Sequence, residues 1–184
     1  MNFLSSSNKR ITPRRLFFAL WPTESIRKVL AEIARDVHCK GRPVPTRNFH
    51  ITLVFLGPVD ANRQGCVERM AEKIEGVPFN IRLDELGCFP RAGIVWLGAS
   101  KTPLALHSLV SKLNQDLADC GFTPEKRPFK THVTLFRKAD KEIENTPHKP
   151  MKWPVSDFCL VESSTLPTGA YYRVLHRWPL RDNP

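Results

Sequence analysis

The feature that most constrains the fold is a His-x-Thr-Leu pattern that occurs twice in matching surroundings. His50-Ile51-Thr52-Leu53 and His132-Val133-Thr134-Leu135 lie 82 residues apart in a chain of 184 residues. Each copy ends a series of the same four parts: an apolar strand, an amphipathic helix, a segment of turn residues and the His-x-Thr strand. The repeat predicts one molecule built from two related halves.

Each half begins with a short apolar strand, over residues 16–21 and residues 94–97. A helix follows from Thr23 in the first half and over residues 103–119 in the second, because apolar residues recur there at helical spacing. The sequence also predicts a helix over residues 62–75 and strands over 50–56, 79–83, 132–136, 155–161 and 172–175. Residues 138–154 contain three prolines and are expected to form a loop.

The strand periodicity gives each motif a polar face. Side chains two residues apart in a strand point to the same side. His50 and Thr52 therefore project together, as do His132 and Thr134, and a pseudo-twofold axis would bring both pairs into one cleft. One imidazole could then accept a proton while the other donates one, and the hydroxyls could hold phosphate oxygens. This array suits in-line displacement at phosphorus without a metal.

Composition bears on the partner and the compartment. The 28 Lys and Arg residues exceed the 18 Asp and Glu residues, and the net charge of +10 favours nucleic acid, an anionic membrane or a phosphate ester. Five cysteines without a Cys-x-x-Cys pair predict reduced thiols in a cytoplasmic protein. No apolar run is long enough to span a membrane.

The segments around both motifs resemble the two-histidine (2H) phosphoesterases, specifically the RNA 2',3'-cyclic phosphodiesterases also known as 2'-5' RNA ligases. The resemblance rests, in order, on RLFFALW, FHITLVFLG, GIVWLG, RPFKTHVTLFRK and YYRVLHRWPL. It implies an α+β fold of two pseudo-symmetric lobes, each with an antiparallel sheet and outer helices, with the active-site cleft between them. Residues 15–184 would form this single domain, and residues 1–14 a flexible N-terminal extension.

The resemblance also implies a reaction: hydrolysis of RNA 2',3'-cyclic phosphate ends to 2'-phosphomonoesters, with reversible 2'-5' ligation as a side activity. By analogy, His132 is the proton acceptor that activates water and His50 is the proton donor to the departing 3' oxygen. Thr52 and Thr134 would hold the phosphate. The near-symmetry of the motifs does not itself decide which histidine is the acid. We expect an RNA partner with this terminus, tRNA fragments among the candidates, no membrane, no metal or other cofactor, and a monomer.

Arg137, five residues after His132, is a further candidate for substrate binding. Its guanidinium could stabilise negative charge on the reacting phosphorus group. Strand parity places Arg137 on the face opposite His132, so it reaches the cleft only if the strand ends or bulges before it. Two roles are therefore compatible with the sequence: Arg137 binds phosphate, or it forms an ion pair at the surface. The same parity puts Phe136 on the histidine face, where it could stack on a base, although core packing is favoured.

Two other functions fit the same residues. The first is a 2H reaction on a small cyclic nucleotide or metabolite, which the basic residues flanking the second motif disfavour weakly. The second is a non-catalytic protein that binds RNA ends, although binding alone does not need a matched acid and base. A metalloenzyme would need more ligands than two histidines, and no carboxylate or cysteine stands at a convincing spacing.

Overall fold

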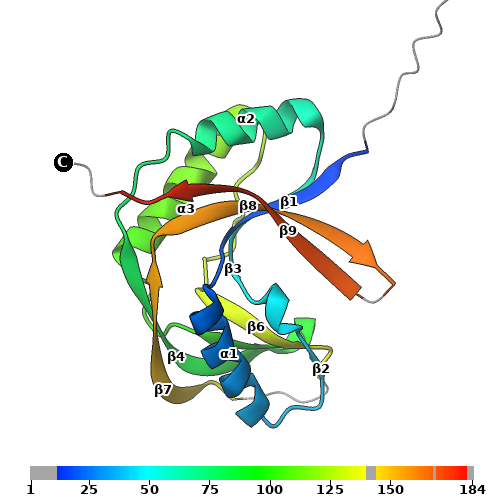
Figure 1. Ribbon diagram of the computed structural model, residues 1–184, viewed down its shortest axis with the longest axis vertical. Helices are drawn as coiled ribbons and strands as arrows, with labels where there is room; N and C mark the ends of the chain where they lie inside the picture. The colour runs from blue at the N-terminus through cyan, green and yellow to red at the C-terminus, as the bar shows by residue number, and fades with distance from the viewer. Residues whose placement is uncertain (1–11, 140–143, 168, 182–184) are drawn as a thin grey trace, which may run out of the picture.

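Two antiparallel sheets form the frame of the computed structural model, which describes residues 12–139, 144–167 and 169–181 (Figure 1). The first sheet has the strand order β3-β1-β8-β9 and contains β1 (Arg14–Leu20), β3 (Ile51–Val59), β8 (Asp157–Leu166) and β9 (Gly169–Pro179). The second has the order β2-β6-β5-β4-β7 and contains β2 (Arg42–Pro43), β4 (Phe79–Phe89), β5 (Ile94–Gly98), β6 (His132–Arg137) and β7 (Thr146–Val155). The predicted α+β class with two antiparallel sheets is confirmed.

The described residues contain three α-helices, α1 (Glu24–Asp36), α2 (Ala61–Ala71) and α3 (Leu104–Leu117), and three short 3-10 turns, η1 (Thr46–Asn48), η2 (Pro90–Ala92) and η3 (Ala118–Cys120). Capping side chains set two helix starts, because Thr23 accepts a hydrogen bond from the Ile26 amide and Asp60 accepts one from the Arg63 amide. α2 packs against α3, and α3 contacts β3. None of these helices is long and apolar enough to cross a membrane.

The predicted repeat appears in the strand pairing. β1 pairs antiparallel with β3, and α1 lies between them in the chain. β5 pairs antiparallel with β6, and α3 lies between them. Each histidine strand is therefore hydrogen-bonded to the apolar strand that opens its own half. One buried core draws on both sheets, with Leu16 and Ile51 from the first and Leu97 and Val133 from the second.

The N-terminal extension expected over residues 1–14 falls mostly outside the described residues, which begin at Thr12. Within the expected extension, Arg14 is already the first residue of β1 and is paired with Val59. Its guanidinium also forms an ion pair with Glu162 on β8, at 2.8 Å.

The expectation of a loop over residues 138–154 is wrong, because β7 begins at Thr146. β7 is the last strand of its sheet and pairs only with β4 among the described strands. An edge strand tolerates proline, since its outer amides need no partner. The alternation that marks the strand lies between the prolines: Met151, Trp153 and Val155 are buried and the residues between them are exposed.

The expectation of five reduced cysteines is wrong for Cys66 and Cys120, which form a disulfide bond. Cys66 lies on α2 and Cys120 ends η3, directly after α3. They are 54 residues apart in the chain, and the packing of α2 on α3 brings them together. No local sequence motif therefore predicts this disulfide. The other three cysteines, Cys39, Cys88 and Cys159, are free.

Candidate active site

The two histidine strands meet although they belong to different sheets. β3 is an edge strand of the first sheet, and β6 lies inside the second. Residues of the two strands contact each other without sharing a ladder of hydrogen bonds (Figure 1). The predicted cleft between two related halves therefore has a physical basis in the contact between β3 and β6.

Both histidine rings are held in the same way. Nδ1 of His50 lies 2.7 Å from the backbone oxygen of Asn48, and Nδ1 of His132 lies 2.8 Å from that of Lys130. A carbonyl oxygen can only accept, so each Nδ1 carries the proton and donates it. This bond fixes the tautomer and leaves Nε2 of each ring as the reactive nitrogen.

Aromatic rings surround both histidines. The His50 ring stacks on Trp21, with centroids 5.6 Å apart, and meets the edges or faces of Phe17 and Tyr172 at 5.0 and 5.1 Å. His132 makes an edge-on contact with Phe89, with centroids 5.0 Å apart. These rings cover part of each imidazole and restrict its orientation, while both histidines remain partly exposed.

This burial changes the acidity of both imidazoles. Several effects together lower the pKa of His50 from 6.5 to about 4: burial is the largest, the hydrogen bond to Asn48 opposes it, and the charge of Arg137 and that of His132 when protonated add to the lowering. Burial also lowers the pKa of His132, with contributions from the charges of Lys130 and Arg137. At neutral pH both rings are therefore neutral, and Nε2 of each ring carries no proton.

The predicted threonines share the faces of their histidines. The hydroxyl of Thr52 lies 3.1 Å from Nε2 of His50, and it donates to that nitrogen because Nδ1 holds the ring's only proton. Thr134 lines the same pocket as His50, although it comes from the other sheet. Of the four predicted histidines and threonines, His50 and Thr134 are among the described residues that line this pocket, whereas Thr52 and His132 are not.

Arg137 also reaches the pocket, because β6 bulges before it. Thr134 pairs with Trp96 and Phe136 pairs with Val95, so Leu135 is an extra residue opposite β5. The bulge sends both Leu135 and Phe136 into the core and returns Arg137 to the side of Thr134. The sequence analysis predicted that Arg137 would reach the cleft only if the strand ended or bulged before it, and the structure contains this bulge. Phe136 is 8% exposed and packs in the core, as favoured.

The pocket contains residues that the sequence did not single out. Tyr172 from β9 and Asn48 from η1 line it, together with the basic residues Arg42 and Lys138. The Asn48 amide also donates to the backbone oxygen of Ala170 at 2.8 Å, which ties η1 to the start of β9. Tyr172 was visible in the sequence as part of YYRVLHRWPL, but its contact with His50 depends on the pairing of β9 with β8 beside β1.

Trp21, like the other three tryptophans, lies in or beside an apolar segment of the sequence, and such a position predicts a core residue. Trp96 and Trp153 are buried in that way, but Trp21 remains partly exposed and stacks on His50. One feature of the sequence could have indicated this position: Trp21 is the last residue before Pro22, where the apolar run ends. A side chain at the end of a buried strand lies where the core meets the cleft.

Comparison with known proteins shows the family to which the chain belongs. The sequence model of the family described as "LigT like Phosphoesterase" matches residues 20–96, which include the first motif. The RNA 2',3'-cyclic phosphodiesterase of Escherichia coli (strain K12) is 35% identical over 173 residues, which cover 91% of this chain and 97% of that protein. The chain belongs to the LigT-like phosphoesterase family.

Further members of the family support this assignment along most of the chain. The RNA 2',3'-cyclic phosphodiesterase of Thermotoga maritima is 31% identical and covers 88% of this chain and 93% of its own length. The crystal structure of E. coli LigT complexed with 3'-AMP superposes with a TM-score of 0.85 at 34% identity, covering 92% of this chain and 99% of that one. The predicted family, fold and enzyme class, a phosphodiesterase, are confirmed.

Proposed function

We propose that this protein hydrolyses RNA 2',3'-cyclic phosphate ends to 2'-phosphomonoesters, with His50 and His132 as the acid and base. The observation that carries the proposal is the matched pair of imidazoles, each with Nδ1 bonded to the carbonyl two residues earlier and each with Nε2 unprotonated. The relatives named RNA 2',3'-cyclic phosphodiesterase and the 3'-AMP in E. coli LigT support a ribose phosphate as the ligand.

The proposed reaction needs one proton accepted and one donated. Nε2 of His132 takes a proton from water as the water oxygen forms a bond to phosphorus. The bond between phosphorus and the 3' oxygen breaks, and Nε2 of His50 gives its proton to that oxygen. The products are a 2'-phosphomonoester and a free 3' hydroxyl, and the two rings return to their starting states by proton exchange with solvent.

His50 must be protonated before it can donate, although its pKa in the free protein is about 4. An anionic cyclic phosphate beside the ring favours the charged imidazolium and so raises this pKa in the complex. The stack on Trp21 supports the same state, because an aromatic face attracts a cation. In the proposal, substrate binding thus favours the protonated form of His50, which is the form that can donate a proton.

The remaining site residues hold the phosphate in the proposal. Thr52 and Thr134 donate hydrogen bonds to its non-bridging oxygens. Arg137 lies in the same pocket as His50 and Thr134, and its guanidinium stabilises the negative charge that develops as the water oxygen attaches. Reversible 2'-5' ligation follows from the same arrangement when a 5' hydroxyl of RNA replaces water as the nucleophile.

The cytoplasm remains the proposed location, and a monomer the proposed state. The Cys66–Cys120 disulfide makes the location testable, because cytoplasmic thiols are kept reduced in most organisms. Alkylation of free thiols in freshly lysed cells, followed by mass spectrometry, reports whether this pair is oxidised where the protein works. Light scattering on the purified protein reports the oligomeric state.

The test of the function is turnover of a short RNA that ends in a 2',3'-cyclic phosphate, in excess EDTA. We expect a 2'-phosphate product from the wild type, and a loss of rate of about 10²–10⁴-fold in His50→Ala and His132→Ala, the usual effect of removing a general acid or base. His107→Ala is the matched control, since His107 is an exposed residue of α3.

Each alternative gives a different result in this assay. RNA that binds without turnover would indicate a non-catalytic protein that recognises RNA ends. Hydrolysis of a mononucleoside cyclic phosphate but not of the RNA would indicate a small cyclic nucleotide as substrate. Activity that disappears in EDTA and returns with a divalent cation would contradict the metal-free mechanism.

A further inference from the structure

A basic recess extends the pocket away from the two motifs. Beyond His50 and Thr134, the pocket is lined by Arg42 on β2, Arg137 at the end of β6 and Lys138. No aspartate or glutamate is among the described residues that line it. We propose that these three basic residues, named here the basic recess, bind a second phosphate, attached to the 5' side of the ribose whose cyclic phosphate reacts, and that Arg137 is shared between the two phosphates.

Two of the basic side chains are held on the same face by strand pairing. Arg42 and Arg137 stand directly opposite each other where β2 pairs with β6. Opposed residues of an antiparallel pair project to the same side, and like charges in that position repel. An anion bound between the two guanidinium groups would be attracted to both charges at once.

Lys138 is placed by a strained backbone. Its φ of 54° is the only positive φ of a residue other than glycine in the described part of the chain. A side chain in this region is disfavoured, so the conformation must be imposed by its surroundings. The amide of the next residue, Ala139, donates to the oxygen of Gly93 at 3.0 Å, and a Cβ on Gly93 would lie 3.4 Å from Cα of Lys138.

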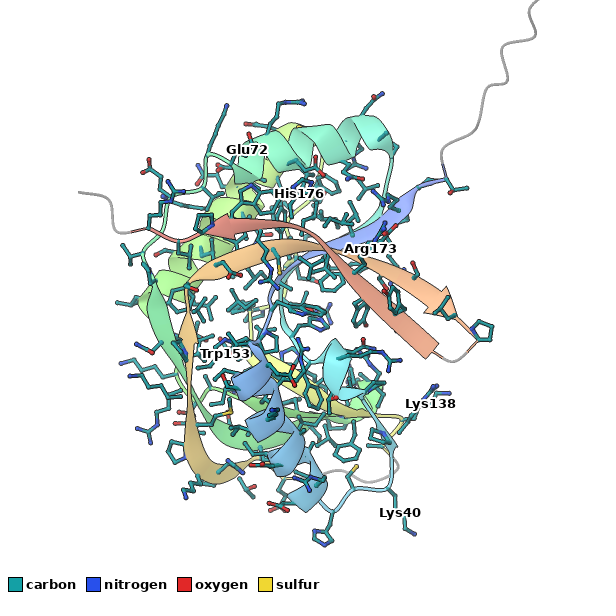
Figure 2. The ribbon with its side chains drawn as sticks, viewed as in Figure 1. Lys40, Glu72, Lys138, Trp153, Arg173 and His176 are labelled. Carbon is teal, nitrogen blue, oxygen red and sulfur yellow. A yellow bond between two sulfur atoms is a disulfide. The ribbon has the colours of Figure 1, made fainter. Side chains whose placement is uncertain are left out.

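A second glycine lies close to the same segment. A Cβ on Gly41 would come within 3.2 Å of the backbone oxygen of Arg137 and 3.3 Å of Cα of Ala139. Backbone packing by Gly41 and Gly93 thus fixes residues 137–139. Figure 2 shows the result: Lys138 lies on the side of the molecule where β2 and the hairpin of β8 and β9 end. Glycine would adopt this backbone without strain, so the presence of a lysine indicates a use for its charge.

The chemistry of the substrate explains why this phosphate is on the 5' side. The inference rests on the proposed function, in which the 2' and 3' oxygens of the terminal ribose are both attached to the phosphate between the two motifs. The only other position of that ribose that carries a phosphate in RNA is its 5' oxygen. Because His50 and Lys138 line one continuous pocket, a single nucleotide can contact both. The second phosphate has two sources, an internucleotide phosphodiester or a terminal 5'-monophosphate.

Three substrates separate these sources: adenosine 2',3'-cyclic phosphate, the same nucleotide with a 5'-phosphate, and the dinucleotide ApA ending in a 2',3'-cyclic phosphate. We expect kcat/KM to rise about tenfold or more with either form of second phosphate, the effect of roughly one charge-assisted hydrogen bond. A gain for the dinucleotide identifies RNA as the source, and a gain for the 5'-monophosphate alone identifies mononucleotides. Equal kcat/KM for all three substrates would overturn the proposal.

Variants at Lys138 test the recess itself. In Lys138→Gly and Lys138→Gln, we expect kcat/KM to fall about tenfold more for the substrates with a second phosphate than for adenosine 2',3'-cyclic phosphate. Lys138→Gly should keep or raise the melting temperature, because glycine relieves the positive φ. Lys138→Arg should retain most of the preference. An equal fall for all three substrates would show that Lys138 does not distinguish the second phosphate.

A binding measurement keeps this inference separate from the proposed reaction. Calorimetry compares adenosine 2',5'-bisphosphate with adenosine 2'-phosphate on the wild type, on Lys138→Gln and on Lys152→Gln, a control on the outer strand β7. We expect the bisphosphate to bind about tenfold tighter to the wild type and to Lys152→Gln, and to lose that advantage in Lys138→Gln. This result would support the recess even if cyclic phosphates were not hydrolysed. Equal affinity for the two ligands would contradict it.

Discussion

Leu53 and Leu135 are the extra residues of two matching β-bulges, each three residues after the histidine of its strand. Leu53 is skipped where β3 pairs with β1, between Thr52 and Val54, and Leu135 is skipped where β6 pairs with β5. Both leucines are buried. The pseudo-symmetry of the molecule therefore extends to an irregularity of the strands, and in each half the fifth residue after the histidine turns away from the core.

The two halves differ at this fifth residue, which is Arg137 in one and Phe55 in the other. Phe55 is 53% exposed, and the guanidinium of Arg15 lies 4.7 Å from its ring centroid. At this position, therefore, only the second half places a positive charge beside the pocket. This difference breaks the symmetry between the histidines and gives the first prediction.

Replacing Arg137 with glutamine should have two effects. The kcat/KM for a cyclic phosphate should fall by about 10²-fold, as expected when a charged group that stabilises the transition state is removed. The pH profile of the remaining activity should move to higher pH, because the charge of Arg137 lowers the pKa of both His50 and His132. Arg69→Gln, an exposed change on α2, should alter neither. A lower rate with an unmoved profile would contradict the electrostatic contact.

The pH dependence of the wild type follows from the same two histidines. Turnover needs one imidazole protonated and the other neutral. Burial lowers the pKa of His50 to about 4 and that of His132 below 6.5, so the required proton is lost as pH rises past the higher of the two values. We expect kcat/KM to be greatest below about pH 6.5 and to fall on the alkaline side, while kcat declines at a higher pH because bound phosphate raises both values. Steady-state rates between about pH 4 and 9 check this, and a kcat/KM maximum above about pH 7.5 would exclude buried neutral rings.

Local periodicity predicted more than long-range pairing could. Period-two alternation is a local property, and the contact between His50 and Thr52 agrees with it. The position of Arg137 could only be stated as a condition, because a bulge depends on how β6 pairs with β5.

Features that depend on contacts between distant parts of the chain could not be predicted from the sequence. β7 was not predicted because its prolines indicate a break in secondary structure. Proline is compatible with a strand at the edge of a sheet, but edge position depends on the pairing of the whole sheet. Trp21 directly follows β1 and Tyr172 lies on β9, and both contact His50 because β8 joins β1 and β9 in one sheet. Likewise, Cys66 and Cys120 are brought together by helix packing alone.

The stability of the protein should fall in acid because of His50. Its pKa is about 4 in the folded protein and 6.5 when unfolded, so the unfolded chain binds the extra proton between these values. The free energy of unfolding is therefore fully retained above pH 6.5 and decreases as pH falls toward 4, by up to about 3 kcal/mol from this residue. Urea denaturation at several pH values measures the slope. His50→Gln should flatten it, His107→Gln should not, and equal slopes for all three proteins would contradict a buried neutral His50.

Loss of the disulfide should destabilise the fold without changing the site. Closing a loop between Cys66 and Cys120, which are 54 residues apart, restricts the unfolded chain and stabilises the protein by up to about 4 kcal/mol. Reduction with dithiothreitol, or the double change Cys66→Ser and Cys120→Ser, should lower the urea midpoint by a matching amount. Dithiothreitol should have no further effect on the double variant, and kcat/KM at low temperature should be unchanged. A full effect of reductant on the double variant would assign the loss to another thiol.

Asn48 should couple the reactive histidine to the hairpin of β8 and β9. It is 4% exposed; its backbone oxygen accepts from Nδ1 of His50, and its side-chain amide donates to the oxygen of Ala170 at 2.8 Å. Asn48→Ala removes the second bond only, and we expect it to cost about 1–3 kcal/mol of unfolding free energy, as for a buried acceptor left unpaired. Asn48→Asp should cost more, because a carboxylate cannot donate to that carbonyl and repels it.

The same variants separate a local role from a structural one. Because Ala170 lines the pocket, KM for a cyclic phosphate should rise in Asn48→Ala, whereas kcat should change less, since the backbone bond to His50 is kept. Asn114→Ala is the matched control: its side chain donates to the oxygen of Val110 within α3, away from the pocket lining. It should lower stability slightly and leave KM unchanged. If both variants changed KM equally, the link between η1 and β9 would have no specific part in substrate binding.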